Sequence, residues 1–99
     1  MRYIVDIDGT ICTYEKGVPY KDANPLKGRI KFFNDLYELG HTIVYWTARG
    51  TVTGLDWYDL TGQQLKEWGA KHHSYKVGKP AYDVLICDKA FNTETFFKN

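Results

Sequence analysis

The chain has 99 residues, of which 43% are hydrophobic and 25% are charged. This composition excludes a disordered tail, a collagen-like chain and a disulfide scaffold, and the length predicts a single domain over residues 1–99. Thirteen basic and twelve acidic residues leave a formal charge of +1, so no strong field attracts nucleic acid or anionic lipid. The longest apolar runs are strand-sized, so we expect no membrane partner. Met1 is followed directly by a predicted strand rather than a signal peptide, and Cys12 and Cys87 lack metal-ligand spacing, which together predict a cytoplasmic protein with reduced thiols.

The first half of the sequence predicts a strand, a loop, a helix and a second strand. The first strand is a β-branched and aromatic run, which is typical of burial on both faces of a parallel sheet. Asn24 and Pro25 suit the N-cap and first position of the helix, and Gly40 suits its end. In order, we expect a strand over Tyr3–Asp8, a loop over Cys12–Asn24, a helix with apolar positions Leu26, Ile30, Phe33 and Tyr37, and a strand over His41–Thr47.

The second half repeats this alternation and ends in an aromatic tail. Alternating strands and helices predict an α/β fold with right-handed crossovers, here a small Rossmann-like three-layer sandwich around a mainly parallel sheet. The tail residues Phe91, Phe96 and Phe97 need a surface to cover or a partner. In order, we expect a loop over Ala48–Gly54, a helix over Asp56–Trp68, and strands over His73–Val77 and Val84–Cys87.

Polar side chains fall where the predicted strands end. Asp6 and Asp8 close the first strand, Thr47 closes the second, Lys79 follows the third and Asp88 closes the last. The carboxyl ends of parallel strands share one edge of a sheet, so we expect these five residues to gather there. Three carboxylates without His or Cys suit Mg²⁺, and Mg²⁺ with a lysine and a threonine hydroxyl suits a phosphoryl group.

Each of these residues also has an ordinary structural interpretation. An aspartate is common at strand ends and turns, Thr47 alone suits a turn, and Lys79 alone suits a solvated surface. Only the joint pattern indicates chemistry. Two other features favour structural roles: His72 and His73 as the entry to a strand, and the aromatic and apolar positions of the second helix as core or interface (Trp57, Leu60 and Trp68).

The run Asp6-Ile7-Asp8-Gly9-Thr10 resembles the first motif of the haloacid dehalogenase superfamily of phosphatases and phosphotransferases. Thr47, Lys79 and Asp88 resemble its second, third and fourth motifs in the right order. The resemblance extends from Tyr3 to Asp88, which is most of the chain.

The resemblance implies a role for each matching position. Asp6 attacks phosphorus and forms an aspartyl-phosphate, and Asp8 serves as general acid and then as general base. Thr47 and Lys79 bind phosphoryl oxygens. Asp6, the backbone carbonyl of Asp8, and Asp88 bind Mg²⁺.

The sequence departs from the family in two places. Cys87 stands where many members carry the first of two adjacent acids, and Asp83 is the alternative metal ligand. The intervals 12–24 and 48–56 are too short for the usual cap domain, so the site is expected to be open. Arg49, which follows Thr47 closely, is expected to meet the leaving group. The Gly50–Gly54 loop and the first-loop residues Tyr14, Lys16 and Tyr20 are placed to do the same, but a solvated loop position is the favoured interpretation for each of them.

The resulting hypothesis is a Mg²⁺-dependent phosphatase that hydrolyses a small phosphorylated metabolite such as a sugar phosphate. A neighbouring subunit shapes the open site in some such proteins, so a homo-oligomer is one expectation. One alternative keeps the chemistry and acts on the 3′ ends of nucleic acids, for which the near-neutral charge offers only modest support. The other alternative is a non-catalytic binding module that retains the motifs.

Overall fold

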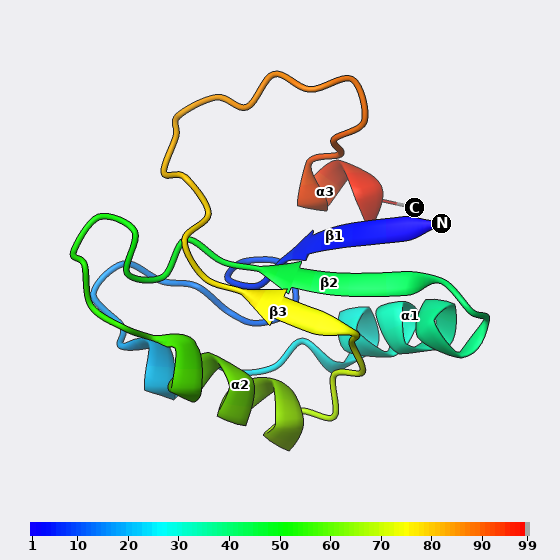
Figure 1. Ribbon diagram of the computed structural model, residues 1–99, viewed down its shortest axis with the longest axis horizontal. Coiled ribbons are helices and arrows are strands. Elements are labelled where there is room, and N and C mark those ends of the chain that lie inside the picture. The colour runs from blue at the N-terminus through cyan, green and yellow to red at the C-terminus, as the bar shows by residue number, and fades with distance from the viewer. Residues whose placement is uncertain (99) are drawn as a thin grey trace.

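The computed structural model, which describes residues 1–98, contains a three-stranded parallel sheet in the order β1-β2-β3 with helices around it (Figure 1). Its elements are β1 (Arg2–Asp6), the 3-10 turn η1 (Tyr20–Asp22), α1 (Lys27–Glu38), β2 (Thr42–Trp46), α2 (Tyr58–Glu67), β3 (Ser74–Lys76) and α3 (Thr93–Phe96). The pairing of β1 with β2 brings Asp6 opposite Trp46, and β3 pairs with the end of β2. The predicted small Rossmann-like α/β fold with a parallel sheet is therefore confirmed.

The core lies on one face of this sheet. Alternate strand residues point to the same face, and Val5, Ile43 and Tyr45 are all buried there. Ile30 and Phe33 of α1 join them at helical spacing, as the sequence predicts. Leu65 of α2 is also fully buried in this cluster, so both long helices contribute to the same core.

Gly62 has a packing role inside α2. A glycine in a helix costs stability relative to alanine, so its presence there needs a reason. A Cβ at this position would overlap the hydroxyl end of Tyr75 in β3. The absent side chain therefore lets α2 pack closely against that strand.

The predicted start of α1 is wrong by two residues. The helix begins at Lys27, and the residue before it, Leu26, makes no side-chain capping hydrogen bond. Asn24 instead exchanges backbone contacts with the preceding loop, where its N–H donates to Thr13 Oγ1 at 2.9 Å. Pro25 pairs with Cys12 in an isolated bridge. These loop contacts outweigh the local capping preference of the Asn-Pro pair.

The first strand is shorter and more exposed than predicted. It ends at Asp6, and the chain then turns through Gly9, whose φ of +80° is readily accessible only to glycine. Ile4 is 55% exposed, because it points away from the core face that holds Val5. The prediction that this strand is buried on both faces is therefore wrong.

The predicted strand over Val84–Cys87 does not form. Residues 80–92, called the 80–92 segment below, are exposed throughout and arch away from the end of β3 toward α3 (Figure 1). A strand needs a partner for its backbone hydrogen bonds, and residues 84–87 pair with none of β1, β2 and β3, although β1 leaves one edge of the sheet free. Apolar character alone does not supply that partner.

Part of the aromatic tail packs against the rest of the protein. Phe96 and Phe97 pack against Phe33 with ring centroids 6.2 and 5.7 Å away, whereas Phe91 stays 73% exposed. The Asn92 side chain accepts a hydrogen bond from the Glu94 N–H and caps α3. Among the described helices, none combines the length and apolar character that crossing a membrane requires.

Candidate active site

Three of the predicted site residues meet at the carboxyl edge of the sheet. Asp6 is the last residue of β1, Thr47 follows β2 directly, and Lys79 follows β3. Backbone hydrogen bonds join the last two: the Lys79 N–H donates to the Thr47 carbonyl at 3.0 Å, and the Thr47 N–H donates to the Lys76 carbonyl at 3.0 Å. The gathering predicted from the strand ends is therefore present for these residues.

Lys79 forms an ion pair with Asp6. The Nζ of Lys79 lies 3.5 Å from Oδ1 of Asp6, and the two side chains are 17% and 38% exposed. Burial raises the pKa of the Asp6 carboxyl, and the positive charge of Lys79 opposes this rise. A carboxylate that remains accessible beside an ammonium group can attack an anionic phosphoester without meeting uncompensated repulsion.

Asp8 is held by donors from several parts of the chain. Its carboxylate accepts hydrogen bonds from Thr47 Oγ1 at 3.1 Å and from Cys12 Sγ at 3.6 Å. Arg49 donates from Nε at 3.0 Å and from Nη2 at 2.9 Å, which makes a two-pronged ion pair. The Asp8 side chain is 15% exposed, so it is fixed in orientation while one side stays open.

Arg49 does not lie at the substrate, where the sequence analysis predicted it. Its side chain is fully buried, and Nη1 donates to Thr61 Oγ1 at 3.2 Å and to Gln64 Oε1 at 2.5 Å. All three guanidinium nitrogens therefore have protein acceptors, including those on Asp8. The Tyr20 ring covers the guanidinium, with its centroid 4.7 Å from Cζ. Arg49 is thus an anchor for Asp8 and is buried away from any substrate.

Thr61 and Gln64 complete what we call the Asp8 network, together with Asp8, Thr47 and Arg49. Sequence reasoning missed both helix residues. Their spacing of three positions places them on one face of α2, where they are buried. Buried polar residues on a core-facing helix need polar partners. Two polar positions on this face of the helix were therefore the sequence signal that could have identified Thr61 and Gln64.

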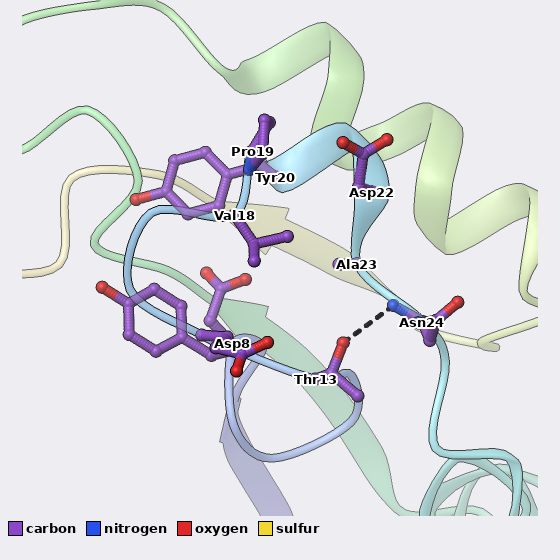
Figure 2. Close-up of a pocket in the computed structure, with 10 residues that line it drawn as sticks. Asp8, Thr13, Val18, Pro19, Tyr20, Asp22, Ala23 and Asn24 are labelled. Atoms are coloured by element: carbon purple, nitrogen blue, oxygen red, sulfur yellow. Dashed lines mark hydrogen bonds between the residues drawn. The ribbon is translucent and has the colours of Figure 1, made fainter.

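A small cavity opens beside Asp8, and we call it the Asp8 pocket (Figure 2). Its volume is about 140 Å³. The hydrogen bond between Thr13 and Asn24 lies along one side of it, and the Tyr20 ring stands at another (Figure 2). Burial raises the pKa of Tyr20, and the nearby negative charge of Asp8 adds to the rise. The pocket is lined by Asp8, Thr13, Tyr14, Glu15, Val18, Pro19, Tyr20, Asp22, Ala23 and Asn24.

The loops that were expected to be too short for a cap hold little regular structure. Residues 13–26 contain the single turn η1, and residues 47–57 contain no helix or strand. Tyr14 and Tyr20 line the Asp8 pocket, whereas Lys16 is an exposed loop residue, as predicted. The site is therefore bordered by the chain's own short loops.

Asp88 is not brought into a metal-binding group with Asp6 and Asp8. It lies in the exposed 80–92 segment, as does the alternative ligand Asp83. Among residues 1–98, no three His, Cys, Asp or Glu side chains come together as a metal site. The prediction that Asp88 closes a strand beside Asp6 is wrong in this arrangement, because the strand that would carry it does not form.

The two adjacent histidines have the predicted structural role at a strand entry. His73 precedes β3, and its Nδ1 accepts a hydrogen bond from the Ile43 N–H at 3.1 Å. His72 Nδ1 contacts the Ala70 carbonyl at 2.8 Å. Trp68 packs against the core, as expected for the apolar side of α2. Both cysteines are free, as predicted.

The fold is similar to that of a target protein from Vibrio cholerae whose crystal structure is known. The TM-score is 0.84, the sequences are 25% identical, and the match covers 96% of this chain and 85% of that chain. No model of a protein family matches this sequence, and no match was found among curated proteins. The likeness establishes the Rossmann-like fold, and the chemistry must be argued from the side chains.

Proposed function

We propose that this protein is a phosphatase that hydrolyses small phosphomonoesters through an aspartyl-phosphate on Asp6. The observation that carries the proposal is the ion pair between Asp6 and Lys79, with Nζ 3.5 Å from Oδ1. It joins a partly exposed carboxylate to a cation from a distant part of the chain. The oriented carboxylate of Asp8 follows on the same strand exit, so the residues proposed as nucleophile, phosphate-binding cation and acid–base group lie at one edge.

The proposed reaction has two steps. An Asp6 oxygen attacks phosphorus, the bond from phosphorus to the leaving oxygen breaks, and that oxygen takes a proton from the Asp8 carboxyl, which must bind this proton against its ion pair with Arg49. Asp8 then takes a proton from water, the water oxygen attacks phosphorus, and the bond from phosphorus to Asp6 breaks. Phosphate is released and the Asp6 carboxylate is restored.

Other residues support these steps by charge and orientation. Lys79 offsets the negative charge of the phosphoryl oxygens as they approach Asp6. Thr47 donates its hydroxyl to Asp8, and Arg49 holds the same carboxylate from the buried side. Fixed geometry of this kind raises the rate because less motion must be frozen in the transition state.

Magnesium dependence enters the proposal through the resemblance to the haloacid dehalogenase superfamily. Bound Mg²⁺ would neutralise charge on the phosphoryl group, with Asp6 and the Asp8 carbonyl as ligands. The third ligand, Asp88, is not in place in the described arrangement, because the residues that precede it are exposed and unpaired with the sheet.

Substitution of the nucleophile tests the proposal. We expect Asp6→Asn to lower phosphate release from p-nitrophenyl phosphate by about 10³-fold or more, because an amide cannot form the intermediate. Asp59→Asn, on the exposed side of α2, is the matched control and should keep its activity. Circular dichroism checks that both variants fold.

Two results would contradict the proposal. Substantial turnover by Asp6→Asn would remove Asp6 as the nucleophile. Absence of turnover by the unaltered protein on a broad panel of phosphomonoesters, with and without Mg²⁺, would favour the non-catalytic alternative.

We propose the cytoplasm as the location, since small phosphorylated metabolites and reduced thiols such as Cys12 occur together there.

A further inference from the structure

We propose that the Asp8 pocket selects phosphomonoesters whose leaving group is a small polyhydroxy alcohol and rejects those whose leaving group carries a second anionic group. The inference rests on the proposed function and names its substrate class. It is carried by the position of the pocket, its charge and its size.

The pocket lies where a leaving group must sit. Asp8 is both a lining residue of the pocket and the proposed donor of a proton to the leaving oxygen. A phosphoryl group beside Asp6 and Lys79 therefore has its ester oxygen near Asp8. The remainder of the alcohol then occupies the adjoining cavity (Figure 2).

The charges of the pocket are all of one sign. Asp8, Glu15 and Asp22 line it, and its ten lining residues include no Lys, Arg or His. The adjacent cation, Arg49, is buried and donates to Asp8, Thr61 and Gln64. The charge of Asp8 is offset by Arg49, so a carboxylate or second phosphate on the leaving group would meet the like charges of Glu15 and Asp22, and no cation among the lining residues offsets these.

The polar groups suit hydroxyls. Ionised carboxylates accept hydrogen bonds from O–H groups, and the phenols of Tyr14 and Tyr20 both donate and accept. Tyr20, which forms one wall of the pocket, is fixed in position. Its ring packs on the Arg49 guanidinium, and its carbonyl accepts a hydrogen bond from Gln64 Nε2 at 2.7 Å. The same arginine therefore fixes the acid–base group and one wall of the pocket.

The size favours a short alcohol. A cavity of about 140 Å³ is smaller than the roughly 300–1,000 Å³ of drug-sized ligand sites. A leaving group of a few carbons with hydroxyls fits such a space better than a nucleotide chain. Charge and size thus both disfavour the 3′ ends of nucleic acids, which carry further phosphates close to the one removed.

Matched pairs of substrates test the inference. Glycerol 3-phosphate and 3-phosphoglycerate differ in the leaving group by a carboxylate at similar size. We expect kcat/KM for glycerol 3-phosphate to be higher by about tenfold or more, the discrimination that repulsion inside a site supplies. Phosphoethanolamine tests the other sign of charge: attraction between its ammonium group and the pocket carboxylates predicts a kcat/KM above that of 3-phosphoglycerate, and a lower value would overturn the charge selection.

Neutralising the pocket tests the cause. The double variant Glu15→Gln/Asp22→Asn should bring the ratio of the two kcat/KM values several-fold closer to one, because like-charge repulsion falls. Glu67→Gln, at the exposed end of α2, is the matched control and should leave the ratio unchanged. Salt should narrow the ratio in the unaltered protein, since it screens the carboxylates.

The outcomes separate this inference from the proposed function. Loss of all turnover, including that of p-nitrophenyl phosphate, would defeat the proposed function itself. Turnover with a ratio near one, or a ratio that the double variant leaves unchanged, would overturn only the charge selection.

Discussion

The Asp8 network and the 80–92 segment carry residues that were expected in one site, and they differ in almost every physical respect. In the network, Thr47, Arg49 and Thr61 are each at most 2% exposed, and every nitrogen of the arginine side chain has an acceptor. In the segment, even the apolar residues are open to solvent, with Ile86 at 93%. The network is held by partners from three parts of the chain, whereas the segment joins only β3 and α3.

This difference shows what assembles a site. The Asp8 network supplies hydrogen-bond partners to the buried charge of Arg49. A buried charge without partners costs so much folding free energy that its acceptors must be held in a specific arrangement. Nothing comparable constrains the 80–92 segment, whose exposed carboxylates are already solvated. The two regions should therefore differ as much in energy and reactivity as in structure.

The largest effect is expected at Arg49. Arg49→Met leaves Asp8 with its charge and without its main partner, so the free energy of unfolding should fall by about 3–5 kcal/mol. Chemical denaturation measures this change. Lys31→Gln is the matched control, because its ion pair with Asp35 is exposed and should contribute less than about 1 kcal/mol.

Arg49→Lys separates orientation from folding. Lysine keeps the positive charge and loses the planar geometry that contacts Asp8, Thr61 and Gln64 together. We expect the proposed phosphatase activity to fall by about 10²-fold while the protein still folds, because Asp8 is no longer held in position. Full activity in this variant would show that the orientation of Asp8 does not limit the rate.

The two cysteines offer a chemical comparison of the regions. Cys12 is fully buried, and burial raises the pKa of its thiol to about 12, so at pH 8 almost no thiolate is present to react. Cys87 lies exposed in the 80–92 segment. With a thiol reagent at pH 8, we expect one fast-reacting group per chain and a second only after denaturation.

Single substitutions identify the two reactions. Cys87→Ser should remove the fast phase, and Cys12→Ser should remove the phase that appears in denaturant. Slow labelling of both thiols in the native protein would mean that residues around Cys87 are covered, as the predicted strand required.

Asp88 tests the same question through function. The resemblance predicts that Asp88→Asn raises the Mg²⁺ concentration needed for half-maximal activity by several-fold, which requires the 80–92 segment to bring this carboxylate near Asp6. The exposed arrangement predicts no change in the free energy of unfolding. A titration with Mg²⁺ measures the first quantity, and an unchanged requirement would point to Asp83 or to no such ligand.

The features that were predictable from sequence are those with a local or repetitive cause. The helical spacing of Ile30 and Phe33 predicts α1, and the parallel arrangement predicts that Lys79 approaches Asp6. Arg49 was misplaced because its acceptors, Thr61 and Gln64, lie on another element that spacing around Arg49 does not reveal. Tertiary partners decide where a charged side chain points.

The error at residues 84–87 likewise lies in tertiary pairing, which a local strand preference does not reveal. Their apolar and β-branched character is a strand preference, and this preference becomes a strand only where an unpaired sheet edge accepts it. In residues 1–98, β1 pairs with β2 alone, so a free edge exists beside Asp6. The chain passes from β3 to α3 without using it, and α3 is instead anchored by contacts of Thr93 with Thr10 and of Glu94 with Arg29.

The smallest expected effect is at Ile86, and it decides between the two arrangements. Ile86→Ala removes apolar atoms that already face water, so the free energy of unfolding should change by less than about 0.5 kcal/mol. Ile43→Ala, the same substitution at a fully buried position of β2, should cost about 2–5 kcal/mol. Denaturant titration compares the two. A cost at Ile86 near that at Ile43 would mean that the segment packs on the sheet, and with it the case for Asp88 as a ligand beside Asp6 would return.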